Sequence, residues 1–115
     1  MDIKKESTDR IKIDISEWNE TVSAYIKPLN GFERLTLNDF FLTFYNKENE
    51  ANVRFDAGFR AALLVLVDDN GDPLLHEDDR TAIKNASFIP LFRLFDLILK
   101  AYENNAAPLD TLKKN

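Results

Sequence analysis

The first part of the chain alternates apolar and polar residues, and the remainder follows a helical period. Residues 11–15 alternate strictly, which is the period of a half-buried β-strand. Residues 21–27 are mostly β-formers, with every second side chain apolar, and only the short polar link 16–20 separates the two runs. We therefore expect a β-hairpin. Trp18 should fold back from the link onto one face, and Pro28 should end the second strand because it has no N–H for the ladder.

Two helix starts follow the hairpin. Asn30 and Thr36 each stand three positions before an acid, Glu33 and Asp39 respectively, which is the spacing of a capping box. The polar residues 46–52 are expected to end this helix. Large apolar residues recur between these points and predict one buried face: Leu37, Phe40, Phe41, Phe44 and Tyr45.

A second helical face begins at Phe55. It continues through Phe59, Ala62, Leu63 and Leu66, and further apolar residues at 64, 65 and 67 extend it around the helix. A helix that is apolar on nearly all sides is expected to be the most buried one. The run 61–67 could instead form a parallel strand, but the period of 3.6 that reaches back to Phe55 favours a helix.

A turn then separates this helix from a short acidic one. The pair Asn70-Gly71 supplies positive φ, and Pro73 cannot continue a helix. The acids at 77–79 place negative charge in the first turn of a helix that reaches about Asn85. Ser87 is expected to cap the last helix, with a proline tolerated in its first turn. Apolar residues at spacings of three and four run along that helix: Phe88, Leu91, Phe92, Phe95, Ile98, Leu99 and Tyr102.

These patterns predict an α+β fold that is mainly α, with an N-terminal β-hairpin followed by about four helices, the last long and amphipathic. We expect one globular domain over residues 11–103, because a chain of 115 residues is a single domain by size. Residues 1–10 are expected to form a flexible arm and residues 104–115 a flexible tail, since both are polar and aperiodic.

Charge and composition narrow the classes of partner. The formal net charge of −5 argues against binding along a nucleic-acid backbone and against attraction to an anionic membrane. The longest strongly apolar run, 61–67, is far shorter than the roughly 20 residues of a membrane span, and no signal peptide is visible. The chain has no cysteine, so it has no disulfide and no thiolate metal site. The expected location is the cytoplasm.

One acidic spacing is that of a calcium-binding loop. Asp68, Asn70 and Asp72 stand at i, i+2 and i+4 between two helices, like the ligands at positions 1, 3 and 5 of an EF-hand. Position 6 must be glycine for the sharp turn but is Pro73, and position 12 should be glutamate but is Asp79. The stretch is therefore interpreted as a turn, and no metal or other cofactor is expected.

No group of residues has the pattern of a catalytic centre. His76 is the only histidine, so metal sites with paired histidines and His-based triads lack their partners. Glu77, Asp78 and Asp79 are consecutive and point in different directions on a helix, so they do not form a facing acid–base pair. With no cysteine and no Gly-rich phosphate loop either, we expect a protein that is not an enzyme.

The last helix carries more large apolar residues than a small core readily hides. They nearly encircle it, which suggests one side on the core and another on a partner subunit or client protein. Core packing remains the usual explanation of this spacing, so all of them could be internal. The substitution Leu94→Asp would test the association. The residues predicted to bind a partner are Phe88, Leu91, Leu94, Phe95, Leu97 and Ile98.

Several short motifs follow one another in a fixed order over residues 11–103. A β-type start around Trp18 leads into Pro-Leu-x-Gly-x-Glu-Arg at 28–34, and an apolar helix ends at Asp68. The turn Asp-Asn-Gly-Asp-Pro-Leu-Leu at 69–75, the acids at 77–79 and Leu-Phe-Arg-Leu-Phe at 91–95 come next. This order resembles the tail assembly chaperone family of long-tailed, siphovirus-type phages and prophages. The common Leu-Asn-Gly-like ending of the last helix in that family is replaced here by residues 100–105.

The resemblance implies a non-enzymatic protein that binds the long helical tape measure protein and keeps it soluble during tail morphogenesis. The tail-tube protein is a further possible partner, a homo-oligomer is possible, and neither nucleic acid nor membrane is expected. The protein would act in the cytoplasm of the bacterial host and be absent from the mature virion. Many members of the family also occur in a longer, frameshifted form, and the end of this chain, residues 113–115, could be encoded by an adenine run.

Two other kinds of protein are compatible with the sequence. One is a small acidic regulatory protein-binding module of phage or bacterial origin, whose client would be a DNA-binding protein or a toxin. The other is a calcium-responsive module, which a calcium titration without a thermal shift would exclude.

Overall fold

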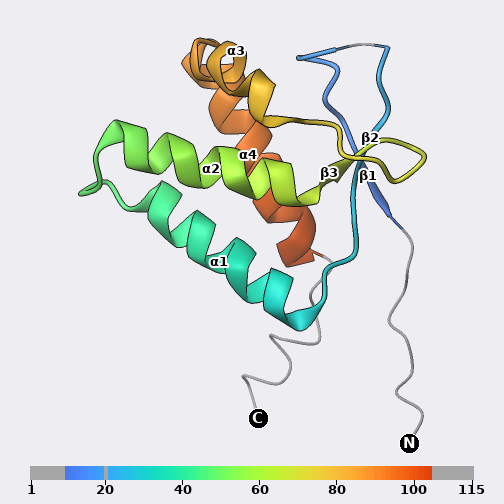
Figure 1. Ribbon diagram of the computed structural model, residues 1–115, viewed down its shortest axis with the longest axis horizontal. Coiled ribbons are helices and arrows are strands. Elements are labelled where there is room, and N and C mark those ends of the chain that lie inside the picture. The colour runs from blue at the N-terminus through green and yellow to red at the C-terminus, as the bar shows by residue number, and fades with distance from the viewer. Residues whose placement is uncertain (1–9, 20, 105–115) are drawn as a thin grey trace, which may run out of the picture.

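The computed structural model describes residues 10–19 and 21–104, and it contains a small sheet beside a layer of helices (Figure 1). The expected arm, apart from Arg10, and the expected tail after Asn104 lie outside the described residues. The elements in chain order are β1 Ile11–Ile13, β2 Ala24–Ile26, α1 Gly31–Tyr45, α2 Ala51–Val65, β3 Leu66–Val67, the 3₁₀ turn η1 Glu77–Asp79, α3 Arg80–Lys84 and α4 Phe88–Asn104. The predicted fold class is confirmed.

The N-terminal hairpin forms as predicted, with shorter strands. β1 and β2 pair antiparallel, with Ile11 opposite Ile26 and Ile13 opposite Ala24. The alternation places Ile13, Ala24 and Ile26 in the core. Lys12, which precedes Ile13 on β1, is exposed on the other face. Trp18 packs against the core from the link, as expected.

A third strand that the sequence analysis did not predict completes the sheet. α2 ends at Val65, and the next two residues form β3, which pairs antiparallel with β2, giving the order β1-β2-β3. The chain can change from helix to strand here because Leu66 takes an extended conformation while its N–H still donates to the Ala62 carbonyl oxygen. The helical prediction for 61–67 is thus correct up to Val65, and the competing prediction of a parallel strand is wrong.

Helix α1 begins at the first of the two predicted starts. The Asn30 side chain accepts a hydrogen bond from the Glu33 N–H at 2.8 Å, and the Glu33 carboxylate accepts one from the Asn30 N–H at 3.1 Å. Together they form a capping box. Lys27 adds an ion pair to Glu33 at 3.2 Å. Thr36, the other candidate cap, lies inside the helix, where its hydroxyl donates to the Phe32 carbonyl oxygen.

Helices α1 and α2 form an antiparallel pair, and α4 packs against them (Figure 1). Phe95 of α4 is fully buried where α4 meets Gly58 of α2. Gly58 allows this close approach, because a Cβ at its position would lie 2.4 Å from Cε2 of Phe95. The core cluster joins all the layers: Ile13, Ile15, Ala24, Ile26, Leu37, Phe41, Phe44, Ala57, Ala61, Ala62, Val65, Leu66, Leu94, Phe95, Ile98 and Tyr102.

The segment after β3 is a turn followed by the expected short helix. Gly71 has φ of +88°, the positive value that the sequence predicted for this turn. Glu77–Asp79 form a 3₁₀ turn that continues into α3, and the Asp79 carboxylate accepts a hydrogen bond from the His76 N–H at 2.9 Å. Arg80 then ties this segment to α2, with an ion pair to Asp56 at 2.7 Å and its guanidinium 4.7 Å from the Phe59 ring centroid.

Candidate partner-binding surface

Exposed large apolar side chains are grouped in two places on the described surface. On α1 they lie in one row at spacings of three and seven residues: Phe32 is 78% exposed, Leu35 65% and Leu42 72%. At the start of α4, Phe88 is 74% and Ile89 58% exposed. Val53, in the first turn of α2, is exposed without belonging to either group. Grouped exposed apolar side chains mark surfaces that bind other proteins.

We call Phe32, Leu35, Asp39 and Leu42 the α1 row. These positions fall on one face of the helix, opposite the face that packs on the core through Leu37 and Phe44. Two threonines, Thr36 and Thr43, lie beside the row and donate their hydroxyl groups to backbone carbonyl oxygens of the row, those of Phe32 and Asp39. These hydroxyl groups are therefore already paired, and the face around Asp39 is largely apolar.

The α1 row was not predicted from the sequence. The helical period was interpreted for the buried face of this helix alone, and the apolar residues on the other side were given no role. The signal was present, however, because Phe32, Leu35 and Leu42 make the helix apolar on two opposite faces.

The six residues predicted on α4 divide between core and surface. Leu94, Phe95 and Ile98 are buried among side chains of this chain, whereas Leu91 and Leu97 are half-buried and Phe88 is exposed. The substitution Leu94→Asp would therefore place an unpaired carboxylate in the core, and it would test folding as well as association. Partner binding by these six residues stays a prediction, and Phe88 is the one most accessible in the isolated chain.

Aromatic side chains connect the start of α4 with the end of α1. The Phe92 ring centroid lies 5.8 Å from that of Phe88, 6.1 Å from that of Tyr45 and 5.9 Å from that of Phe44. The Tyr45 hydroxyl donates to Asp96 at 3.1 Å. Burial, followed by this hydrogen bond, raises the pKa of Tyr45, so the hydroxyl stays neutral in the physiological range. The exposed Phe88 ring is thus supported by a packed aromatic cluster.

The acidic residues that suggested calcium binding form a turn stabilised by its own side chain. One carboxylate oxygen of Asp68 accepts hydrogen bonds from the Asn70 N–H at 2.9 Å and the Asp72 N–H at 3.0 Å. Within residues 10–19 and 21–104, no group of three or more His, Cys, Asp or Glu side chains could hold a metal ion. The Asp68 carboxylate therefore has a structural role in closing the turn.

The residues considered for catalysis, His76 and Glu77–Asp79, are consecutive at the 3₁₀ turn, and their neighbours Arg80 and Asp56 form ion pairs there. His76 is exposed. Glu77 pairs with Arg80 at 3.1 Å. Partial burial would raise the pKa of Asp56, but hydrogen bonds from Arg80 and Arg60 outweigh it and lower that pKa. These contacts join α2 to the segment before α4.

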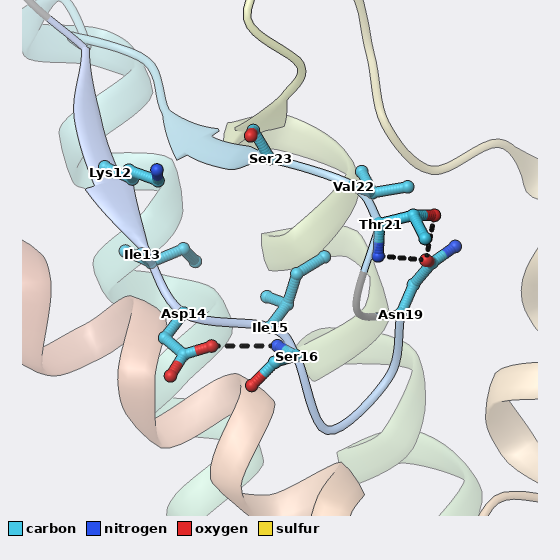
Figure 2. Close-up of a pocket in the computed structure, with 9 residues that line it drawn as sticks. All are labelled: Lys12, Ile13, Asp14, Ile15, Ser16, Asn19, Thr21, Val22 and Ser23. Atoms are coloured by element: carbon cyan, nitrogen blue, oxygen red, sulfur yellow. Dashed lines mark hydrogen bonds between the residues drawn. The ribbon is translucent and has the colours of Figure 1, made fainter.

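A pocket of about 190 Å³ lies between the two arms of the hairpin and their link (Figure 2). Four of its polar residues bond in pairs: the Asn19 side-chain oxygen accepts from the N–H and hydroxyl of Thr21, and Asp14 accepts from the Ser16 N–H. Among the described residues that line it, Lys12 and Asp14 are the charged ones. Asp14 is the only acid among these lining residues, so they supply no pair of acids.

No helix in the described part of the chain has the length and apolar character needed to cross a membrane.

Comparisons with known proteins give one remote likeness. No protein-family model matches the chain, and a search of curated proteins finds no match. Among solved structures, the chain is similar to the tail assembly chaperone of bacteriophage HK97, with 18% sequence identity over 78% of this chain and 85% of that one. The TM-score is 0.47, and at this value the likeness carries no argument about function.

Proposed function

We propose that this chain is a phage tail assembly chaperone that binds the tape measure protein and keeps it soluble while the tail assembles. The order of motifs over residues 11–103 supports the choice of family by its resemblance. The observation that carries the proposal is the presence of two groups of exposed apolar side chains, on α1 and at the start of α4, on a domain whose core is complete without them.

The mechanism follows from the chemistry of such a client. A long helical protein that later lies inside a tail exposes apolar seams before it is enclosed. Helices of the chaperone cover those seams by helix-on-helix contact, which removes the apolar area from water. The formal net charge of −5 on the chaperone keeps the complex dispersed. Release of the client to the tail-tube protein, and absence of the chaperone from the finished virion, belong to the same proposal.

Coexpression with the tape measure protein from the same genome, followed by affinity capture through a tag on this chain, tests the function. We expect a soluble complex, and an insoluble tape measure protein when it is expressed alone. If the tape measure protein stays insoluble and nothing is captured, the chaperone proposal fails. The regulatory protein-binding module is then the better interpretation.

A variant with a matched control tests the predicted contribution of α4. Phe88→Asp removes the exposed ring at the first position of α4, and Val53→Asp makes the same kind of change in the first turn of α2. Aspartate is favourable near a helix N-terminus, so neither variant should unfold the chain. We expect Phe88→Asp to reduce the captured tape measure protein severalfold and Val53→Asp to leave it unchanged. Equal capture by both variants would remove Phe88 from the binding surface.

A further inference from the structure

We propose that the α1 row is the docking surface for an amphipathic helix of another protein that carries a lysine or arginine among apolar residues, and that this cation pairs with Asp39. The identity of the partner rests on the proposed function, whereas its chemistry is argued from the row itself.

The spacing of the row is that of a helix–helix seam. Phe32, Leu35, Asp39 and Leu42 are separated by three, four and three residues, like the inward positions of a coiled coil. At 1.5 Å per residue the row is roughly 15 Å long, or about three helical turns. α1 lies at one edge of the helical layer, and the exposed fractions of the three apolar side chains show that no described element covers this side (Figure 1). A partner helix of three or more turns therefore fits along it.

Asp39 determines what the partner must carry. It lies between two exposed leucines, and its carboxylate has no hydrogen bond or ion pair with the described residues. A partner that covered Leu35 and Leu42 would take this carboxylate out of water, which is unfavourable unless a cation and hydrogen-bond donors replace the water. Lysine and arginine can meet this need because their aliphatic stems cover apolar surface while the charged group reaches the acid.

A second copy of this chain does not provide that cation. Parallel pairing of two α1 rows places Asp39 opposite Asp39. Antiparallel pairing, with Phe32 opposite Leu42, places Asp39 opposite Leu35. The residues that flank the row on α1 bring no positive charge either: Thr36, Asn38, Thr43 and Tyr45. Both arrangements would bury two carboxylates without a counter-ion, so the row is better suited to a different chain.

Long-range charge favours the same kind of partner. The chain has 20 acidic and 15 basic residues, so it attracts a basic segment before contact is made. The apolar side chains of the row then supply the apolar area that is buried on binding, and Asp39 sets the register of the bound helix.

Binding of three synthetic helices to the full-length chain tests the inference. The probes are fluorescein-labelled 21-residue peptides with leucine at the seam positions. The three peptides differ only at the central seam position, which is lysine, leucine or glutamate. Fluorescence anisotropy at nanomolar peptide, below the range of peptide self-association, gives the affinities. We expect the lysine peptide to bind at least tenfold more tightly than the glutamate peptide, a difference of about 1.4 kcal/mol. The leucine peptide should lie between them.

Substitution of Asp39 supplies the decisive comparison. Asp39→Lys should reverse the order, so that the glutamate peptide binds best, and Asp39→Leu should favour the leucine peptide. Asp69→Lys makes the same change of charge in the exposed turn after β3 and should keep the wild-type order. Circular dichroism and thermal melting confirm that each variant is folded. The inference is overturned if Asp39→Lys leaves the order of the three peptide affinities unchanged. It is also overturned if none of the three peptides binds.

Sedimentation of the free chain tests the competing occupant. A concentration-dependent dimer that Leu42→Asp abolishes would assign the α1 row to a second copy and overturn the inference. The coexpression experiment separates the two proposals. Capture of the tape measure protein without reversal by Asp39→Lys overturns the inference about the α1 row and leaves the chaperone function standing. Peptide reversal without capture removes only the chaperone function.

Discussion

Replacing Gly58 with alanine is expected to destabilise the fold, although alanine is the better helix former. Gly58 lies inside α2 and is buried against the side chain of Phe95 on α4. A Cβ added there would lie 2.4 Å from Cε2, 2.6 Å from Cδ2 and 3.0 Å from Cζ of that ring. Ordinary contacts between carbon atoms are about 3.5–4.0 Å, so α4 or the Phe95 ring must move.

The magnitude follows from two opposing effects. Alanine in place of glycine in a helix interior gains about 1 kcal/mol through helix propensity. Extra atoms in a well-packed core cost about 1–3 kcal/mol. The upper end applies because Phe95 is fully buried and its ring makes an edge contact with Phe44, with the centroids 5.0 Å apart. The net destabilisation is therefore about 2 kcal/mol, which lowers the melting temperature by roughly 8 °C in a domain of this size.

Urea denaturation, followed by circular dichroism and by the fluorescence of Trp18, measures the change in the free energy of unfolding. Trp18 is the only tryptophan and packs against the core, so it reports on the same transition. Gly31→Ala is the matched control. It makes the same substitution at the start of α1, where a Cβ would meet no atom within 4 Å. We expect that control to keep or slightly raise the stability.

The double variant Gly58→Ala/Phe95→Leu tests the cause. A smaller side chain at 95 makes room for the new methyl group, so the double variant should be more stable than the sum of the two single changes predicts, by about 0.5–3 kcal/mol. The reasoning is refuted if Gly58→Ala is as stable as Gly31→Ala, or if the two substitutions add without coupling.

Three further predictions concern the start of α1 and the end of α4. Asn30→Ala removes the side chain that accepts from the Glu33 N–H and should lower the free energy of unfolding by about 1 kcal/mol, measured by urea denaturation. Tyr102→Phe removes the hydroxyl that donates to the Lys27 carbonyl oxygen and should lower the free energy of unfolding by roughly 1–3 kcal/mol in the same assay. An unchanged urea midpoint would mean that water replaces this hydrogen bond. The Asn30 N–H, followed by Lys27, holds the pKa of Glu33 below its ordinary value of 4.5, with slight burial opposing both. A lowered folded-state pKa means that Glu33 stabilises the fold above pH 4.5 and that this contribution is lost as the pH falls through the folded-state pKa. Between about pH 5 and pH 3, the wild-type chain should therefore lose more stability than Glu33→Gln, and parallel pH profiles of the two would contradict this assignment.

Local patterns predicted most of the elements. Alternation gave the hairpin, the capping-box spacing at Asn30 gave the start of α1, and the Asn70-Gly71 pair gave the turn with positive φ at the glycine. Each depends on residues within a few positions of one another, which is why a single sequence suffices to predict them. Asn30 and Thr36 have the same spacing to an acid, so this pattern does not choose between them, and in the structure α1 begins at Gly31, directly after Asn30.

The candidate surface was less accessible to prediction. Periodicity marks the apolar faces of a helix, but it does not say which face meets the rest of the molecule. On α1 only the buried face was predicted, and the packing of α2 and α4 leaves the α1 row uncovered. On α4 it could not separate Leu94, which packs inside, from Phe88, which is exposed.

The sequence by itself determined the hairpin, the order of the helices and the lack of a catalytic motif, because these are set by residue chemistry over short distances. The tertiary structure decided the pairing of β3 with β2, the contact between Gly58 and Phe95, and the exposure of the α1 row. All three depend on residues far apart in the chain, and burial is a property of such contacts and not of any one segment.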